Sequence, residues 1–254
     1  MKPIDRMIMN SIAERFRNGK GRLILLDYDG TLVEYKSKPD NATPTRELND
    51  LLGRLASDPR NTMYLITGRG YRDIDSLFPA SRFNLIADHG AMIRSDGEWS
   101  SLLETDNSWK PYVRTMIEDI GLHCPGSFLE EKEFSLAWHY RNTGEERGHL
   151  YSRKLIGDIS SGSRTRKLKI IDGNKVVEIT STGVSKGNAV NHLLSGSKYE
   201  FIFCAGDDRT DEDMFYFLRK YEQAVTVKVG DGDSLAGYRV ETPEVLLSLL
   251  GRIL

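Results

Sequence analysis

The residues best suited to chemistry begin with two aspartates, Asp27 and Asp29, which stand two positions apart directly before Gly30. Carboxylates this close repel each other unless a proton or a cation lies near both. The pair therefore suits a hard divalent cation, which prefers oxygen ligands. A pair of helix-capping or turn aspartates is the structural alternative, because aspartate is common where a strand ends in a turn. Taken alone, the pair leaves both interpretations open.

Further polar segments lie far along the chain and need the same explanation. They are the segment Thr67-Gly68-Arg69, Lys186, and the aspartates Asp207, Asp208 and Asp211. By itself, Thr67 would be a helix N-cap and Lys186 a solvated surface lysine. Several carboxylates with one lysine are also the set expected around Mg²⁺ and a phosphate group, since this metal accepts phosphate oxygen as a ligand. Their joint occurrence favours one phosphate-handling site.

A carboxylate in such a site can attack phosphorus and form an aspartyl-phosphate, which divides hydrolysis into two easier steps. Asp27, at the end of a strand, is the predicted nucleophile, and Asp29, on the turn, is the predicted general acid and then base. Thr67 is expected to donate a hydrogen bond to a phosphoryl oxygen, and Lys186 to supply positive charge. The predicted chemistry is phosphoryl transfer with Mg²⁺ as cofactor.

A parallel sheet must position these residues. Residues 23–26 are four large aliphatic residues, too few for a free-standing helix, and they suit a strand that is buried on both faces. Similar apolar runs at 62–66, 83–87 and 199–205 are separated by stretches of helical periodicity. This order predicts βαβ units in a Rossmann-like α/β fold. Right-handed crossovers would bring the acids that follow the strands to one edge of the sheet.

The middle of the chain has a different order of elements. Helical patterns at 109–120 and 144–159 alternate with pairs of strand patterns at 127–141 and 164–179. This α-β-β-α-β-β order predicts a second, smaller α/β domain inserted into the first. We therefore expect a core domain made of residues 1–103 and 184–254, and an inserted cap domain made of residues 104–183.

Composition limits the class of protein. The 254 residues carry a formal net charge of −2 and are 39% hydrophobic, which is typical of a soluble globular chain. A charge this small predicts no nucleic-acid partner and no membrane partner. Cys124 and Cys204 lie far apart without a metal-binding pattern, and no apolar run reaches the ~18 residues of a membrane span. We expect a cytoplasmic protein.

Four segments match a known pattern when taken together. They are Asp27-Tyr28-Asp29-Gly30-Thr31-Leu32, the strand that ends in Thr67, Lys186, and the segment from Gly206 to Asp213. They resemble the four signature motifs of the haloacid dehalogenase superfamily of phosphatases, and they span nearly the whole chain. The resemblance implies that Asp27, the backbone carbonyl of Asp29, and Asp207 bind Mg²⁺. It also implies that Asp208 and Asp211 support the site from behind or orient Lys186.

Further motifs lie in and around the expected cap. They are Asp88-His89-Gly90-Ala91, Glu130-Glu131-Lys132, and the segments 136–141, 176–179 and 183–190. They are similar to motifs of the trehalose-6-phosphate phosphatases, a family within that superfamily. The resemblance implies hydrolysis of trehalose 6-phosphate to trehalose and phosphate.

The same resemblance implies a set of substrate-binding residues. The set comprises Glu130, Lys132, Arg141 and Glu178 of the cap, with Gly68, Arg69 and His89 of the core. Carboxylates and lysines can accept hydrogen bonds from sugar hydroxyls and donate to them. Without the resemblance, the glutamates at 130–133 would be a solvated strand edge, and His89 a structural histidine.

One position departs from the family pattern. Asn174 stands where the family often has a lysine, and Lys175 follows it. A shift of one residue along a strand turns the side chain to the opposite face. We therefore expect Lys175 to miss the sugar unless a bulge intervenes.

Two other functions share part of this pattern. A related phosphatase for sucrose phosphate or another phosphosugar would have the same core acids, and only the cap residues argue against it. A regulatory domain without catalysis, associated with a trehalose-phosphate synthase, is the alternative from another class. The presence of Asp27, Asp29, Lys186 and Asp207 argues against a loss of catalysis.

Overall fold

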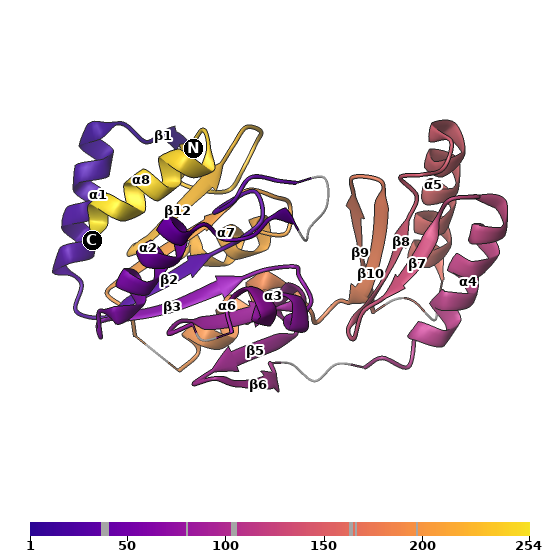
Figure 1. The fold of residues 1–254 in the computed structure, drawn as a ribbon, viewed down its shortest axis with the longest axis horizontal. Helices are drawn as coiled ribbons and strands as arrows, with labels where there is room; N and C mark the ends of the chain where they lie inside the picture. Colours follow the sequence, from indigo (N-terminus) through magenta and orange to yellow (C-terminus); the bar gives the residue numbers. More distant parts are fainter. Residues whose placement is uncertain (37–40, 80, 103–105, 163–164, 166, 197) are drawn as a thin grey trace. The chain divides into compact units, whose positions relative to one another are not determined.

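The computed structural model describes residues 1–36, 41–79, 81–102, 106–162, 165, 167–196 and 198–254 (Figure 1). The chain forms two compact units. The first comprises Met1–Leu102 and Ser185–Leu254, and the second comprises Leu103–Val184. Each unit has its own sheet. Residues 103–105, where the pattern of the sequence changes, lie outside the described residues.

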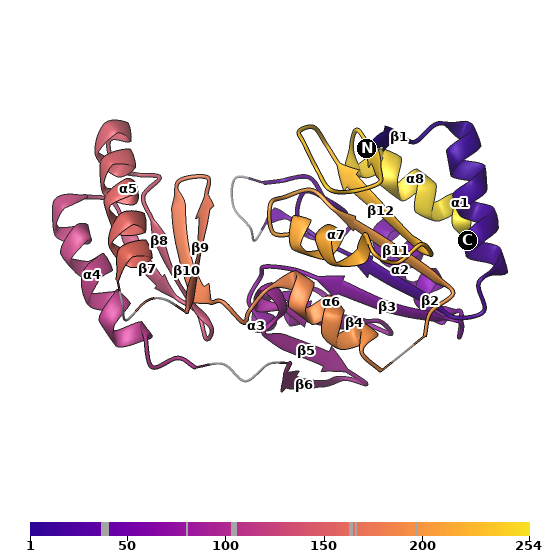
Figure 2. The same ribbon diagram turned by 180° about the vertical axis from the view of Figure 1, so that it is seen from behind.

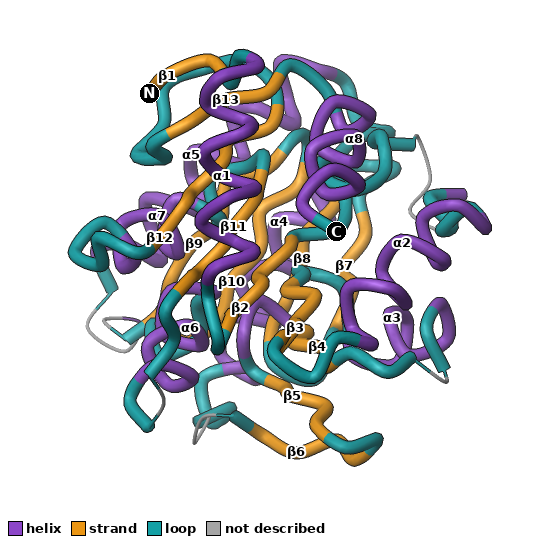
Figure 3. The backbone as a smooth tube through the Cα atoms, turned by 90° about the vertical axis from the view of Figure 1, so that its left-hand side faces the viewer, coloured by secondary structure: helices purple, strands orange, loops and turns teal. Residues whose placement is uncertain are grey.

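The first unit is built on a sheet whose strands are mostly parallel. In the described part of the chain this sheet has nine strands, in the order β1-β13-β12-β11-β2-β3-β4-β5-β6. The strands are β1 (Lys2–Pro3), β2 (Arg22–Leu26), β3 (Asn61–Ile66), β4 (Asn84–Ala87), β5 (Met92–Ser95), β6 (Glu98–Ser101), β11 (Phe201–Gly206), β12 (Ala224–Val229) and β13 (Tyr238–Val240). Neighbours from β1 to β4 pair in parallel, which confirms the predicted parallel sheet. Figure 3 shows β13 near the top and β6 at the bottom.

β2 is an inner strand of this sheet, between β11 and β3. Its four aliphatic residues, 23–26, are fully buried, as expected for a parallel strand covered on both faces. Leu26 pairs with Ala205 of β11 and with Leu65 of β3. The chain segments that follow these three strands therefore emerge at the same edge of the sheet.

Helices cover both faces of the sheet. Figures 1 and 2 show α1, α2 and α8 on one face and α6 and α7 on the other. The helices of the first unit are α1 (Arg6–Asn18), α2 (Arg46–Ser57), α3 (Tyr71–Leu77), α6 (Lys186–Leu194), α7 (Glu212–Leu218) and α8 (Pro243–Ile253). α2 buries its stripe of leucines at 48, 51, 52 and 55, which drives its packing. Among the described residues, no helix has the length and apolar character needed to cross a membrane.

The second unit places two helices on one face of a smaller antiparallel sheet (Figure 1). The helices are α4 (Lys110–His123) and α5 (Glu145–Ser161), and the strands are β7 (Phe128–Glu131), β8 (Ser135–His139), β9 (Leu168–Gly173) and β10 (Val176–Ser181). The strand order is β7-β8-β10-β9. Trp138 and Val177 of the sheet pack with Val113 of α4 and Leu155 of α5 in one hydrophobic core. The predicted α-β-β-α-β-β order is confirmed.

The hairpin β5–β6, which extends the first sheet beyond β4, was not predicted. Its turn is Asp96-Gly97, and both residues have positive φ, 53° and 85°. This is the geometry of a two-residue type I′ turn. Asp-Gly is a strong signal for such a turn, so the dipeptide could have revealed the hairpin.

Candidate active site

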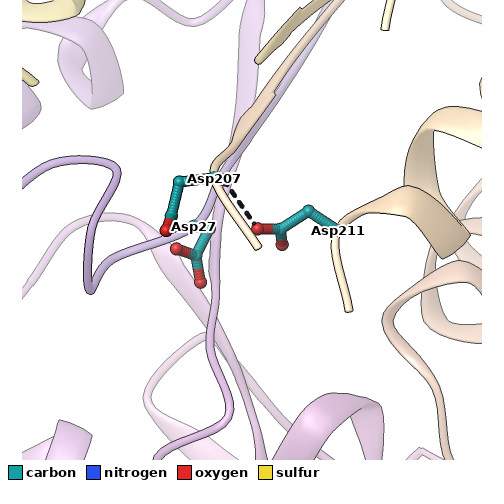
Figure 4. Close-up of side chains that lie close together, drawn as sticks. All are labelled: Asp27, Asp207 and Asp211. Atoms are coloured by element: carbon teal, nitrogen blue, oxygen red, sulfur yellow. Dashed lines mark hydrogen bonds between the residues drawn. The ribbon is translucent and has the colours of Figure 1, made fainter. Parts of the chain in front are cut away.

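Three carboxylates meet at one edge of the first unit's sheet. Asp27 follows β2, Asp207 follows β11, and Asp211 directly precedes α7. Each of the three residues offers an oxygen that lies within 4.8 Å of the oxygens of the other two (Figure 4). The parallel register of β2 and β11 explains why Asp27 and Asp207, distant in sequence, are neighbours.

Lys186 lies among these carboxylates with only 2% of its side chain exposed. Its Nζ donates to Asp27 Oδ1 and to Asp211 Oδ1, both at 2.7 Å. Lys186 is the first residue of α6, and Ser185 fixes the start of this helix by accepting a hydrogen bond from Asn188 N. A lysine that follows no strand thus reaches the same site as the strand-end aspartates.

Asp211 and Asp208 organise the loop that follows β11. Asp211 Oδ2 accepts hydrogen bonds from the backbone N–H groups of Asp207, at 2.8 Å, and Asp208, at 3.0 Å. Asp208 Oδ1 accepts from the backbone N–H and from the hydroxyl of Thr210. Because both oxygens of Asp211 are engaged, one by Lys186 and one by the loop, Asp211 is less suited to bind a metal than Asp207.

The negative charges of the carboxylates at this site are only partly balanced by Lys186. Burial raises the pKa of Asp27 to about 7, Asp207 and Asp208 add to this shift, and Lys186 opposes it. Burial and repulsion from Asp211 and Asp208 raise the pKa of Asp207 to about 6. A divalent cation with oxygen ligands would supply the missing charge. The donor set therefore fits Mg²⁺, and Asp27 and Asp207 are the carboxylates best placed to hold it.

Asp29 is bound to Arg69 and is not one of the three clustered carboxylates. Arg69 Nε donates to Asp29 Oδ2 at 2.7 Å, and Arg69 Nη2 donates to Oδ1 at 2.6 Å. Arg69 also lies over the Tyr28 ring, 5.2 Å from its centroid. The next residue, Gly30, has φ of 83°, which glycine adopts without strain. Any larger residue would also clash there, because its Cβ would lie 2.3 Å from Asp207 Oδ2. The metal contact expected of the Asp29 backbone carbonyl stays a prediction.

The segment Thr67-Gly68-Arg69 is held by the turn that follows β4. The backbone N–H groups of Asp88 and His89 donate to Arg69 O at 2.8 Å and Thr67 O at 3.1 Å. Asp88 and His89 have φ of 50° and 54°, which is rare outside glycine. The His89 ring lies against Gly68, where a Cβ would be 2.4 Å from His89 Cε1. Thr67 Oγ1 accepts from Arg69 N at 3.1 Å, so its own O–H can donate to a ligand.

Sequence reasoning missed three residues that contact Asp207. Thr31 Oγ1 donates to Asp207 Oδ1 at 2.9 Å, and the Tyr35 hydroxyl lies near enough to this carboxylate to lower its pKa. Lys228 is buried in β12 and donates to the backbone carbonyl of Asp207. A lysine within the run 224–229, which is otherwise alanine, valine and one threonine, is a usable signal, because lysine is rarely buried without a partner. No comparable signal marks Tyr35.

A second polar cluster lies in the second unit, on its sheet. Lys132 Nζ donates to Glu178 Oε1 at 3.2 Å, and Ser135 Oγ donates to the same oxygen at 2.5 Å. Glu130 Oε2 lies 2.7 Å from His139 Nε2. The hydrogen bond from His139 holds the pKa of Glu130 below its usual value despite burial, and Lys132 adds to this effect. Pairing of the strands thus brings Glu130, Lys132 and Glu178 together.

Arg141 and Lys175 make their hydrogen bonds elsewhere in the second unit. Arg141 is exposed, and its Nη2 donates to the backbone oxygen of Asn174 at 2.9 Å. Lys175 stands in the turn between β9 and β10 with φ of 63°, and its Nζ donates to Glu145 Oε1 at 2.9 Å. The structure therefore does not bring either residue into the cluster around Glu178.

Comparison with known proteins adds to this geometry. The model of the family described as "Trehalose-phosphatase" matches residues 25–244. A "Bifunctional trehalose-6-phosphate synthase/phosphatase" of Thermoproteus tenax is 39% identical over 254 residues, covering 100% of this chain and 34% of that protein. The UDP-forming alpha,alpha-trehalose-phosphate synthase B of Dictyostelium discoideum is 32% identical over 255 residues, covering 98% and 32%. The chain spans about a third of the length of these two curated relatives.

A solved structure covers nearly the same length as this chain. It is the C-terminal domain of a trehalose-6-phosphate phosphatase of C. albicans, which is 26% identical with a TM-score of 0.88. The match covers 100% of this chain and 98% of that one. The similarity therefore extends over both units of the fold.

Proposed function

Because the chain belongs to the trehalose-phosphatase family, we propose that it hydrolyses trehalose 6-phosphate to trehalose and phosphate, with Mg²⁺ as cofactor. The observation that carries the proposal is the grouping of Asp27 and Asp207, at the ends of two neighbouring parallel strands, with Lys186, the first residue of α6. A nucleophile, a cation and a metal ligand in one site are what phosphoryl transfer requires. The first unit is the proposed catalytic core, and the second is the proposed sugar-binding cap.

In the proposed reaction, Asp27 attacks phosphorus, and the bond between phosphorus and the sugar oxygen breaks as Asp29 gives that oxygen a proton. The product is an aspartyl-phosphate on Asp27. Water then attacks phosphorus, Asp29 accepts a proton from it, and the bond to Asp27 breaks to release phosphate. Lys186 orients Asp27 through its 2.7 Å hydrogen bond, and the Thr67 hydroxyl donates to a phosphoryl oxygen.

Mg²⁺ is proposed to bind the carboxylates of Asp27 and Asp207 and the backbone carbonyl of Asp29. When bound, it neutralises part of the negative charge of the carboxylates and the phosphate. The raised pKa values of Asp27 and Asp207 support this assignment, because both shifts reflect buried, mutually repelling carboxylates. Thr31 and Lys228 hold Asp207 at its carboxylate and at its backbone.

The sugar is proposed to bind Glu130, Lys132 and Glu178. Their two carboxylates and one ammonium group can accept hydrogen bonds from sugar hydroxyls and donate to them. Their proximity within one sheet supports this role. Arg141 of the second unit, with Gly68, Arg69 and His89 of the first, completes the proposed set.

The test is release of phosphate from trehalose 6-phosphate by the purified chain with Mg²⁺. We expect kcat/KM to exceed that for sucrose 6-phosphate and glucose 6-phosphate by at least about 100-fold, because buried polar groups reject substrates that leave them unpaired. Comparable rates with unrelated esters would contradict trehalose 6-phosphate as the specific substrate, although the chain would still be a phosphatase. Asp27→Asn should abolish hydrolysis, and an unchanged rate would contradict the mechanism.

A second candidate function is regulation of a trehalose-phosphate synthase with which the chain associates. The names of two relatives favour it, since one is a bifunctional synthase/phosphatase and the other a synthase. A purified chain that releases no phosphate but changes the rate of such a synthase would support this candidate. The cytoplasm is the proposed compartment for either function, because Cys124 and Cys204 are buried free thiols.

A further inference from the structure

Lys110 is a buried lysine at the N-terminus of its helix, where a cation is unfavourable. It is the first residue of α4, and its side chain is 9% exposed. The first turn of α4 contains no acidic residue, and Trp109 provides no side-chain cap. The helix dipole disfavours positive charge at this end, and burial of an ammonium group is costly. The stability of α4 therefore does not explain why a lysine stands here.

The side chain of Lys110 binds the turn that joins β7 to β8. Its Nζ donates to the backbone carbonyl of Glu133 at 2.8 Å and to that of Lys132. The Glu131 carboxylate lies 3.8 Å from the same Nζ. Asn107 Nδ2 also donates to the Glu133 carbonyl, at 3.1 Å. Two side chains at the start of α4 thus hold this turn by its backbone.

The turn carries one member of the proposed sugar site. Lys132 N donates to Ser135 O at 3.0 Å, which closes the turn. The side chains of the same two residues both donate to Glu178 Oε1. A displacement of the turn would therefore move the Lys132 ammonium group away from the Glu178 carboxylate.

We propose that Lys110 is a positioning residue for sugar recognition. By binding the carbonyls of Lys132 and Glu133, it fixes the β7–β8 turn so that the Lys132 ammonium group is held where a sugar hydroxyl binds. This inference rests on the proposed function and adds a residue that does not itself contact the sugar. Its effect belongs to the affinity for the sugar and leaves the chemistry at phosphorus unchanged.

The first test uses Lys110→Met, which removes the ammonium group and keeps a side chain of similar length. KM for trehalose 6-phosphate should rise about tenfold, as for loss of one charged hydrogen-bonding group, and kcat should stay within about twofold. For 4-nitrophenyl phosphate, which has no sugar, kcat/KM should be unchanged. Lys154→Met is the matched control, because it removes an exposed lysine of α5 that is paired with Asp158. It should leave the kinetic constants for both substrates unchanged.

A double-mutant cycle tests whether Lys110 acts through Lys132. Lys132→Ala alone should raise KM, and adding Lys110→Met to it should have no further effect. Two independent, multiplying effects on KM would overturn the inference. If Lys110→Met does not fold, Asn107→Ala removes the weaker hold on the same turn and should raise KM about two- to threefold at unchanged kcat.

The outcomes separate this inference from the proposed function. A wild-type chain that is inactive on trehalose 6-phosphate overturns the proposed function and this inference with it. If the wild type is active and Lys110→Met has the same KM, this inference alone is overturned. If Lys110→Met does not fold, an unchanged KM in Asn107→Ala overturns it in the same way.

Discussion

Arg69 and Asp29 form a bidentate ion pair, in which each carboxylate oxygen accepts one guanidinium N–H, at 2.7 Å and 2.6 Å. Because each carboxylate oxygen accepts one N–H group of Arg69, the ion pair fixes the orientation of the Asp29 carboxylate. The arginine therefore controls the position of the proposed general acid. Its backbone N–H donates to Thr67 Oγ1, so the proposed phosphate contact and the proposed acid are structurally linked.

Replacement of Arg69 by lysine should lower kcat for trehalose 6-phosphate about 10- to 100-fold, because an ammonium group cannot hold both carboxylate oxygens. Hydrolysis of 4-nitrophenyl phosphate should fall less, since nitrophenolate leaves without a proton. Steady-state kinetics on both substrates measures the difference. Equal losses would show that Arg69 does not act through Asp29. Arg72→Lys, at an exposed neighbour that lies over the Tyr71 ring, is the control and should be neutral.

Mg²⁺ should stabilise the folded chain, because it relieves repulsion between Asp27 and Asp207. In the metal-free chain the pKa of Asp27 is about 7, above its ordinary 3.8. The unfolded chain therefore releases this proton first, and stability should fall as pH rises from about 4 to 7. Thermal unfolding at pH 7.5 with saturating Mg²⁺ should show Tm about 5 °C higher than with EDTA. In Asp207→Asn, Mg²⁺ should raise Tm much less. An increase as large as in the wild type would show that Asp207 does not bind the metal.

Asp58→Asn should lower the free energy of unfolding by about 2 kcal/mol at pH 7, between the values of exposed and buried ion pairs. Asp58 neutralises Arg22, which is 1% exposed and lies 2.5 Å away. Hydrogen bonds from Arg60, and then Arg22, hold the pKa of Asp58 well below its usual 3.8. The unfolded chain therefore binds this proton first as pH falls, so the stabilisation is full above about pH 4 and is lost progressively as pH falls from there toward the lowered pKa of the folded chain.

Denaturant unfolding at pH 7 and pH 3 measures this effect. The difference between wild type and Asp58→Asn should be smaller at pH 3. Arg60→Gln, which removes the partner whose side chain is 49% exposed, should cost much less stability than Asp58→Asn, because exposed ion pairs are screened by solvent. A larger loss in Arg60→Gln than in Asp58→Asn would show that burial of Arg22 is not what makes the pair matter.

Two glycines should respond in opposite ways to alanine. Gly53 lies inside α2 with open space at its Cβ position, so Gly53→Ala should stabilise the chain by about 0.5–1 kcal/mol. Gly68→Ala should destabilise it and slow hydrolysis, because its Cβ would lie 2.4 Å from His89 Cε1. Removing the ring in Gly68→Ala/His89→Ala should restore part of the stability. If the double variant is no more stable than Gly68→Ala, the clash with His89 is not the cause.

Parts of the fold could be predicted because they follow from local patterns. Residues 23–26 are aliphatic at every position, and they form an inner strand that is buried on both faces. The α-β-β-α-β-β order of the second unit was visible in the same way. Asp27 and Asp207 follow two of the predicted strands, and parallel pairing makes them neighbours.

Other features depend on strand order and on the choice of partner, which local patterns do not contain. Glu130 and Glu178 lie in the same row of the sheet because both pair with Ala137 of β8, whereas Arg141 binds Asn174 at another place. The ion pair between Arg69 and Asp29 depends on two loops that come close to each other only in the folded chain. In the sequence, Lys110 looks like any lysine at the start of a helix. Its role is visible only from its hydrogen bond to the β7–β8 turn in the folded structure.

The insertion of the second unit also has a consequence for the order of folding. Lys186 and Asp27 are 159 residues apart in sequence, yet they form a buried hydrogen bond within the first unit. Much of the chain between them forms the second unit, a continuous segment with its own core. Closing a long unstructured loop costs entropy, and the cost falls when the loop already contains a folded body. Early folding of the second unit should therefore speed the pairing of β2 with β11, and a chain in which that unit is destabilised should complete the first sheet more slowly.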